Sequence, residues 1–125
     1  MDDVLFTDRE LDLMAVLWEH GPSTVADVKE RLADDLAYTT VLTILRTLEE
    51  KGYVGHESEG RAYRYHALVA RGEARVSAVD RITRKLFSGS METLLSHLVS
   101  DQDLTDEQLE RIRSILDARL GGGEE

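Results

Sequence analysis

Threonine side chains crowd one short stretch of the chain, TTVLTILRT at residues 39–47. A helix turns by about 100° per residue, so one arc of this stretch would carry short hydroxyl groups and a single cation. The arc comprises Thr39, Thr40, Leu42, Thr43, Arg46 and Thr47. Threonine hydroxyls can bond base edges or phosphates, apolar groups can touch thymine methyls, and arginine can bond guanine or phosphate. The pattern is typical of a helix that enters the DNA major groove, with an ordinary solvated surface as the alternative.

The opposite arc of the same stretch is apolar. Val41, Ile44, Leu45 and Leu48 follow the i, i+3, i+4, i+7 spacing of a helix face that packs on a core. Six of the nine residues from 39 to 47 are β-branched, which favours a strand locally. Because tertiary packing holds most helices in proteins, the spacing still predicts a helix, which ends near Gly52.

Two further helices are predicted before this one. Thr7 and Glu10 have the spacing of a capping box, and the Gly21-Pro22 pair ends the first helix. The predicted apolar stripe of the first helix is Leu11, Met14, Ala15, Leu17 and Trp18. The second helix starts from a cap at Ser23 or Thr24. Its predicted inward-facing residues are Val25, Val28 and Leu32.

A β-hairpin is predicted after the third helix. Tyr53 and Val54 begin one extended segment, and residues 62–68 alternate in the manner of another. Gly55 and Gly60 lie in the polar stretch between the two segments, where we expect a mobile tip. Three helices followed by a hairpin form the outline of a winged helix-turn-helix.

The second extended segment predicts where basic groups would lie on this hairpin. Tyr63 and Tyr65 alternate with Arg64 and His66, which would put aromatic groups on one face and basic groups on the other. The pattern therefore predicts a wing that contacts phosphate or the minor groove through Arg61, Arg64 and His66. Ordinary solvation is the alternative for each of them.

Three more helices with apolar stripes are predicted after Gly72. Thr105 and Gln108 have capping-box spacing at the start of the last one. So few residues make a thin core on their own, and pairing with a second copy of the chain would bury the stripes. The predicted dimerisation residues are Val76, Val79, Ile82, Leu86, Leu94, Leu95, Leu98, Leu109, Ile112 and Leu116.

These patterns together predict a mainly α chain with two parts. Residues 1–70 would form a winged helix-turn-helix, with three helices and a β-hairpin wing. Residues 71–120 would form a three-helix dimerisation part, and residues 121–125 a disordered tail.

The distribution of charge along the chain is compatible with a nucleic-acid partner. The chain has a net charge of −10, which argues against such a partner at first sight. Residues 38–85, however, hold nine basic and six acidic side chains, whereas the segments on either side are strongly acidic. The positive segment contains both the threonine-rich helix and the predicted wing. A protein-interaction adaptor that binds no DNA is the alternative that the net charge favours.

The sequence offers no catalytic or metal-binding pattern. It has no cysteine, and His20, His56, His66 and His97 are too scattered for a metal-ligand spacing. Residues 101–112 fail as a calcium loop because they lack its central glycine and its final glutamate. We therefore expect no enzyme activity, no cofactor and no metal.

Composition also bears on where the protein acts. The chain contains no run of 18 apolar residues, so we expect no insertion into a membrane. The N-terminal MDDVLFTDRE is acidic where a secretory signal would be basic and then apolar. A cytoplasmic location fits both observations.

Four segments of the chain are characteristic in their order and spacing. They read LFTDRELDLMAVLWEHG (5–21), YTTVLTILRTLEEKGYV (38–54), GRAYRYHAL (60–68) and KLFSGSMETLLSHLV (85–99). Together they resemble the penicillinase repressor (BlaI/MecI) family over about residues 5–120. The resemblance implies a homodimeric transcriptional repressor that binds palindromic, double-stranded operator DNA through an N-terminal winged helix. It also implies that three C-terminal helices interlock the two copies.

The resemblance assigns roles to single residues as well. It implies that the operator-contacting helix is residues 39–50, with Thr40, Thr43 and Arg46 at matching positions. Many members carry a second basic residue where this chain has Thr47, so the resemblance implies a different or weaker contact there.

The resemblance further implies a route of release linked to antibiotic resistance. In members paired with a membrane β-lactam sensor, induction involves cleavage within the second C-terminal helix. The matching bond is His97–Leu98, where the best-known members have Asn-Phe. A winged-helix regulator that is released by a small ligand, without proteolysis, is the alternative.

Overall fold

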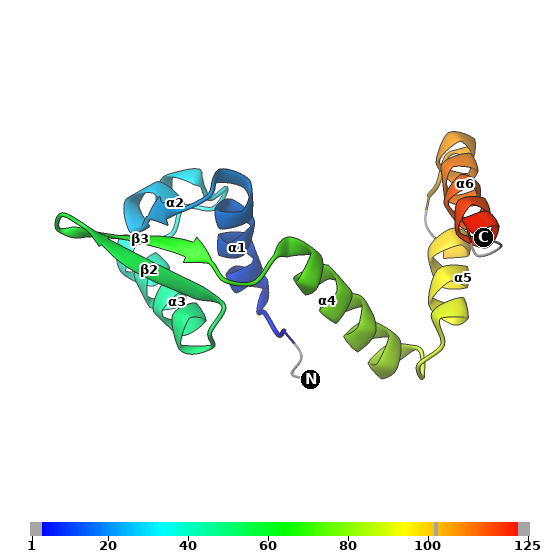
Figure 1. Ribbon diagram of the computed structural model, residues 1–125, viewed down its shortest axis with the longest axis horizontal. Helices are drawn as coiled ribbons and strands as arrows, with labels where there is room; N and C mark the ends of the chain where they lie inside the picture. Colours follow the sequence, from blue (N-terminus) through cyan, green and yellow to red (C-terminus); the bar gives the residue numbers. More distant parts are fainter. Residues whose placement is uncertain (1–3, 102, 123–125) are drawn as a thin grey trace. The chain divides into compact units, whose positions relative to one another are not determined.

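A computed structural model of the chain describes residues 4–101 and 103–122. Its elements are α1 (Asp8–His20), β1 (Ser23–Thr24), α2 (Val25–Arg31), α3 (Tyr38–Glu50), β2 (Val54–Glu59), β3 (Ala62–Ala67), α4 (Arg71–Leu86), α5 (Met91–Asp101) and α6 (Asp106–Gly122) (Figure 1). They form two compact units, whose boundary lies between Val79 and Asp80 within α4. The predicted mainly α fold with an N-terminal winged helix is confirmed.

Two capping boxes start the first two helices. The Thr7 hydroxyl accepts from the backbone N–H of Glu10 at 3.1 Å, and the Glu10 carboxylate accepts from the N–H of Thr7 at 2.8 Å. Thr24 and Asp27 repeat the arrangement at the start of α2, with distances of 3.1 and 3.2 Å. The cap of α2 is therefore Thr24 and not Ser23, whose side chain is buried.

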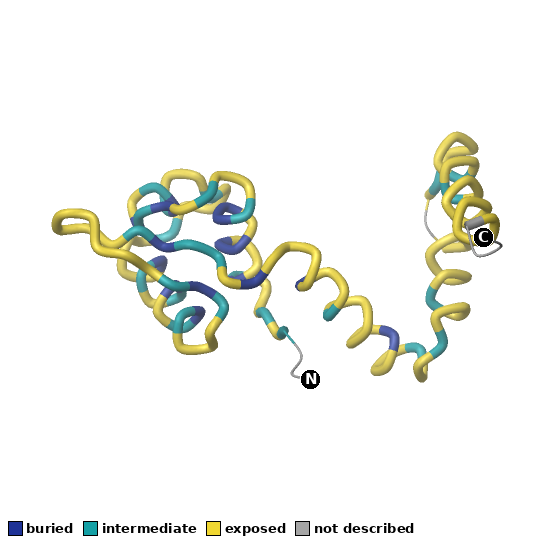
Figure 2. The backbone as a smooth tube through the Cα atoms, in the orientation of Figure 1, coloured by how far each residue is buried: buried dark blue, intermediate teal, exposed yellow. Residues whose placement is uncertain are grey.

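The core of the first unit lies between α1, α2, α3 and the sheet. Its buried side chains include Leu13, Met14, Val16, Leu17, Val25, Val28, Val41, Leu45, Leu48, Val54 and Tyr65. Figure 2 shows most of the buried positions in these elements and a few on and just before α4, whereas the tip of the hairpin is exposed. The inward-facing residues predicted for α2 and α3 are confirmed, although Leu32 and Ile44 are only partly buried.

The predicted apolar stripe of α1 is wrong in part. Leu11 and Ala15 are exposed, while Leu13 and Val16, which the prediction left out, are buried. The buried face of α1 includes the charged side chain of Glu10, which is 4% exposed. A hydrophobic pattern does not count a charged residue among the inward-facing ones, although Glu10 lies on the buried face.

The third helix ends as the sequence predicts. The backbone N–H of Lys51 bonds the carbonyl of Thr47 at 3.0 Å, and Tyr53 N–H bonds the carbonyl of Leu48 at 3.0 Å. Gly52 lies between them with φ of +84°, a left-handed conformation that glycine adopts without steric strain. The chain can therefore turn directly from α3 into β2.

The sheet has three antiparallel strands in the order β1-β3-β2. The β2–β3 hairpin is longer than the polar sequence at its centre suggests, because the pairing continues from Val54↔Ala67 out to Glu59↔Ala62. Gly60, with φ of +63°, and Arg61 form the turn. Strand β1 pairs with β3 only at Ser23↔Tyr65 and Thr24↔Arg64, so the outer half of the hairpin has two strands (Figure 1).

The second unit buries few side chains within one chain. No residue of α5 is buried, and Thr83 is the one buried residue among those described from Asp80 onward. Helix α6 continues to Gly122, so the first two residues of the expected tail are helical, and residues 123–125 lie outside the described residues. None of the described helices is long and apolar enough to cross a membrane.

Candidate nucleic-acid interface

The outer arc of α3 carries most of the predicted DNA-contacting side chains to the surface. Thr39, Thr40, Thr43 and Arg46 are exposed, while Thr47 is partly buried. Leu42 is also partly buried and packs against the core, which leaves less of it for a thymine methyl than the helical projection suggests. The arc is thus a short-chain polar surface with one cation.

Two threonine hydroxyls on this arc already have acceptors within the helix. Thr43 Oγ1 donates to the carbonyl of Thr39 at 2.9 Å, and Thr47 Oγ1 donates to the carbonyl of Thr43 at 3.1 Å. In this arrangement their oxygen lone pairs remain able to accept hydrogen bonds. The complementary groups in the major groove are the amino groups of adenine and cytosine.

Arg46 is the cation of the arc, and it forms no ion pair with a residue that the structure describes. The nearest acid along the helix, Glu49, has another partner. Nδ1 of His56 on β2 lies 2.8 and 2.7 Å from the two carboxylate oxygens of Glu49. This contact joins α3 to the hairpin and leaves the Arg46 guanidinium available to a phosphate or a guanine.

Sequence reasoning missed an aromatic cluster beside this contact. The His56 ring lies 4.4 Å from the ring of Tyr63 and 5.4 Å from that of Tyr65, centroid to centroid. Tyr65 is buried, and burial raises the pKa of its hydroxyl, whereas Tyr63 is about half exposed. The hairpin register, which pairs His56 with Tyr65, is the signal that could have revealed the cluster.

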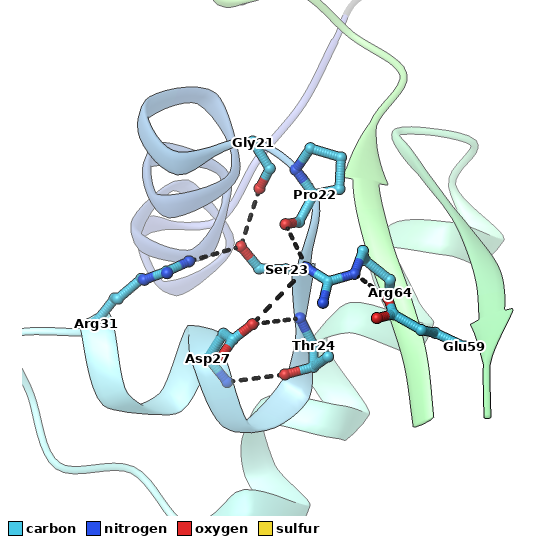
Figure 3. Close-up of polar contacts among 8 residues, drawn as sticks. All are labelled: Gly21, Pro22, Ser23, Thr24, Asp27, Arg31, Glu59 and Arg64. Carbon is cyan, nitrogen blue, oxygen red and sulfur yellow. Dashed lines mark hydrogen bonds and ion pairs between the residues drawn. The ribbon is translucent and has the colours of Figure 1, made fainter. Parts of the chain in front are cut away.

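The two arginines of the predicted wing differ in their surroundings. Arg61 is exposed at the turn and has no ion pair with a described residue. Arg64 donates through Nη1 to the carbonyl of Pro22 at 3.1 Å and through Nε to the carboxylate of Glu59 (Figure 3). Its Nη1 also lies 3.9 Å from Oδ2 of Asp27. Arg64 therefore faces the protein's own acceptors.

A depression of about 420 Å³ lies beside these contacts in the first unit. Its lining residues are Pro22, Glu57, Ser58, Glu59, Arg64 and His66. Glu59 is hydrogen-bonded by Arg64, which lowers the pKa of its carboxyl below the ordinary range. Within residues 4–101 and 103–122, no group of three or more histidines and carboxylates is placed to hold a metal ion.

The predicted dimerisation residues lie on α4, α5 and α6, and most are exposed within one chain. Val76, Val79, Ile82, Leu86, Leu95, Leu98 and Leu116 are exposed, and Leu94, Leu109 and Ile112 are partly buried. The His97–Leu98 bond lies within α5, where Nδ1 of His97 is 2.7 Å from Oδ2 of Asp101. Most of these apolar groups are thus exposed in a single copy.

Comparisons with known proteins agree with this arrangement. The model of the penicillinase repressor family matches residues 6–118. The transcriptional regulator BlaI of Mycobacterium tuberculosis (strain CDC 1551 / Oshkosh) is 38% identical over 96 residues, covering 74% of this chain and 70% of that protein. The methicillin resistance regulatory protein MecI of Staphylococcus aureus (strain N315) is 20% identical over 115 residues, covering 90% of this chain and 94% of that protein.

A solved structure is similar to more than half of the chain. The solution structure of the DNA-binding domain of the repressor BlaI has a TM-score of 0.52 and 27% identity, and it covers 58% of this chain and 90% of that one. Proteins of this family are transcriptional repressors and not enzymes. From its sequence, its winged helix and these relatives, the chain belongs to the penicillinase repressor family of DNA-binding transcriptional repressors.

Proposed function

We propose that the protein acts as a homodimer on a palindromic operator in the cytoplasm, with helix α3 of each copy in the major groove. The observation that carries the proposal is the outer arc of α3, whose exposed groups are three threonines and Arg46. Long acidic side chains on this arc would repel the phosphate backbone, and none occurs there before Glu49. Thr39, Thr40, Thr43 and Arg46 are the proposed base and phosphate contacts, with Leu42 and Thr47 at the edge.

The apolar surfaces of the C-terminal helices support the dimer. Large exposed apolar patches on a soluble protein usually mark an interaction surface. A second copy is the occupant that their distribution over α4, α5 and α6 fits best, because a two-fold interface buries the same patch on both copies. Dimerisation would fix the spacing of two recognition helices, which then reach half-sites about one helical turn apart or a multiple of it.

DNA binding is tested by fluorescence anisotropy on DNA from upstream of the protein's own gene, against scrambled DNA, at two salt concentrations. We expect sequence-selective, salt-sensitive binding that Arg46→Ala weakens. Arg9→Ala is the matched control, because it removes the same charge from α1, where Arg9 pairs with Asp34 at 2.7 Å. Equal binding to both DNAs, followed by an empty selection from genomic fragments, would rule out the repressor function.

The dimer is tested on the same helices. Leu98→Asp places a charge among the exposed apolar groups of α5, and we expect sedimentation to report a monomer that binds the operator far more weakly. Ser100→Asp is the control, since it adds the same charge at an exposed polar position of the same helix. If the Leu98→Asp protein remained a dimer, these helices would not form the interface.

Release from DNA is the last step of the proposal. We propose that a membrane sensor pathway leads to cleavage at His97–Leu98, which would destroy the dimer interface. Mass spectrometry of the protein from cells exposed to a β-lactam should then reveal a fragment that begins at Leu98. Derepression with an intact chain would instead favour control by a small ligand. An adaptor that binds no DNA does not fit the family to which the chain belongs.

A further inference from the structure

The guanidinium of Arg64 contacts three different parts of the first unit. Its partners are Glu59 on β2, the carbonyl of Pro22 before β1, and Asp27 in the first turn of α2 (Figure 3). We propose that Arg64 is a positioning residue that fixes the direction of the wing, and that Arg61 at the turn makes the phosphate contact. This inference rests on the proposed function, because it concerns how the wing meets DNA.

Arg64 lies at the end of the three-stranded part of the sheet, where the hairpin continues with two strands. Strand β1 pairs with β3 only at Tyr65 and Arg64, so beyond Arg64 the hairpin continues as a ribbon of two strands. A two-stranded ribbon in water is marginally stable and twists easily. The Arg64 side chain ties the outer part of this ribbon, through Glu59, to the turn that precedes α2.

The turn that receives Arg64 is itself held in place. The buried Ser23 hydroxyl donates to the carbonyl of Gly21 at 2.9 Å and accepts from Nη1 of Arg31 at 3.1 Å (Figure 3). The carboxylate of Asp27 is fixed by its capping bond to the backbone of Thr24. Arg64 is therefore anchored to a rigid part of the helix-turn-helix, as a positioning contact must be.

The charges around Arg64 make it a poor phosphate ligand. A phosphate would have to displace the carboxylate of Glu59 and would meet Asp27 close by. Arg61 has no ion pair with a described residue, and its side chain extends from the exposed turn. A DNA phosphate therefore binds Arg61 at lower cost in lost contacts than Arg64.

A double-mutant cycle in the full-length protein separates positioning from direct contact. Arg61→Ala, Arg64→Gln and the double variant are compared by anisotropy on the upstream duplex over a range of salt concentrations. Arg61→Ala should lower the magnitude of the slope of log K against log salt by about 0.9, the value for one lost phosphate contact. Arg64→Gln should lower the magnitude of this slope by up to the same amount. The double variant should lower it by no more than Arg61→Ala does alone, because both substitutions remove the same contact.

Two exposed glutamates of β2 supply the matched comparison. Glu59→Gln removes the carboxylate that Arg64 holds, whereas Glu57→Gln removes an equal charge two residues away that forms no ion pair with a described residue. Both variants reduce repulsion of DNA, but only Glu59→Gln frees the wing. We expect Glu59→Gln to bind more weakly than Glu57→Gln, and NMR relaxation of the DNA-free protein to show faster motion of the wing amides in Glu59→Gln and Arg64→Gln.

Each outcome of the cycle has a distinct meaning. Additive slope changes, with tighter binding and a steeper slope for Glu59→Gln, would make Arg64 a phosphate ligand and overturn the inference while leaving the proposed function intact. Unchanged wing relaxation in both variants would overturn it as well. A wild-type protein that binds no duplex in a salt-dependent way would overturn the proposed function and the inference together.

Discussion

The ammonium Nζ of Lys51, just after α3, lies 2.8 and 2.9 Å from the two carboxylate oxygens of Glu10, near the start of α1. Glu10 is almost fully buried, and the same carboxylate caps α1 by accepting from the N–H of Thr7. The Glu10 side chain thus caps the start of α1 and joins it to the residue that follows α3.

Loss of the Lys51 ammonium should destabilise the first unit. Lys51→Met keeps most of the aliphatic chain but leaves a buried carboxylate without its cation, so we expect the free energy of unfolding to fall by about 1–2 kcal/mol. Urea denaturation measures the loss. Lys29→Met is the control, because Lys29 pairs with a fully solvated Asp35 and its loss should cost less than about 0.5 kcal/mol. Equal effects of the two substitutions would contradict the structural role of Lys51.

The same carboxylate predicts how stability depends on pH. Burial acts to raise the pKa of Glu10, but hydrogen bonds from Lys51 and Thr7 outweigh it, and the net effect lowers the pKa below its ordinary value of 4.5. Because the folded state binds this proton less readily than the unfolded state, the stabilisation is complete above the ordinary value. It is lost as the pH falls through the lower folded value.

Glu10→Gln isolates this contribution, since glutamine can still accept from the Thr7 N–H. The difference in free energy of unfolding between wild type and Glu10→Gln should be constant near neutral pH and should shrink at pH values below about 4.5. Thermal melts at a series of pH values measure it. A difference that stayed the same into strong acid would show that the charge of Glu10 is not what stabilises the fold.

The indole of Trp18 should stabilise the junction between the sheet and α4. Its Nε1 donates to the carbonyl of Val69 at 2.8 Å, and the Arg71 guanidinium lies 5.7 Å from the centre of the ring. Trp18→Phe leaves that carbonyl without its donor, so we expect a loss of about 1 kcal/mol and faster amide exchange in the first turn of α4. Tyr63→Phe, which removes a hydroxyl from a half-exposed ring, should change neither quantity.

Substitution of Gly52 should destabilise the first unit because of its backbone conformation and not because of a steric clash. A Cβ atom built there has no neighbour within 4 Å, yet φ is +84°. Gly52→Ala should therefore destabilise the first unit by about 1 kcal/mol, and Gly52→Asn by less. Gly72→Ala in α4 has open space and no positive φ, so it should instead stabilise by a few tenths to about 1 kcal/mol. Chemical denaturation of the three variants checks the signs.

The features that the sequence predicted correctly are those that a local residue pattern determines. The capping residues Thr7 and Glu10, the face of α3 that packs inward, and the glycine that ends α3 all follow from spacing along one helix. The burial of Glu10 does not follow from such a pattern, because it depends on Lys51, which is far away in sequence.

The interface was predicted less completely for the same reason. The positions of the threonines follow from helix geometry, but the difference between Arg61 and Arg64 depends on Pro22 and Asp27, which approach Arg64 only in the folded unit. The contact between Glu49 and His56 likewise requires α3 and β2 to be adjacent. Charges that are alike in sequence therefore acquire different surroundings through tertiary contacts.

Trp18 is the chain's single tryptophan, and its position gives the protein a built-in optical reporter. The indole lies where the hairpin leads into α4, bonded to Val69 and covered by Arg71, whereas α3 contains no tryptophan. Intrinsic emission therefore reports on this junction and not on α3. A spectral shift when unlabelled operator is added would mean that binding changes the surroundings of Trp18 at the start of α4. An unchanged spectrum would mean that DNA binds without disturbing this junction.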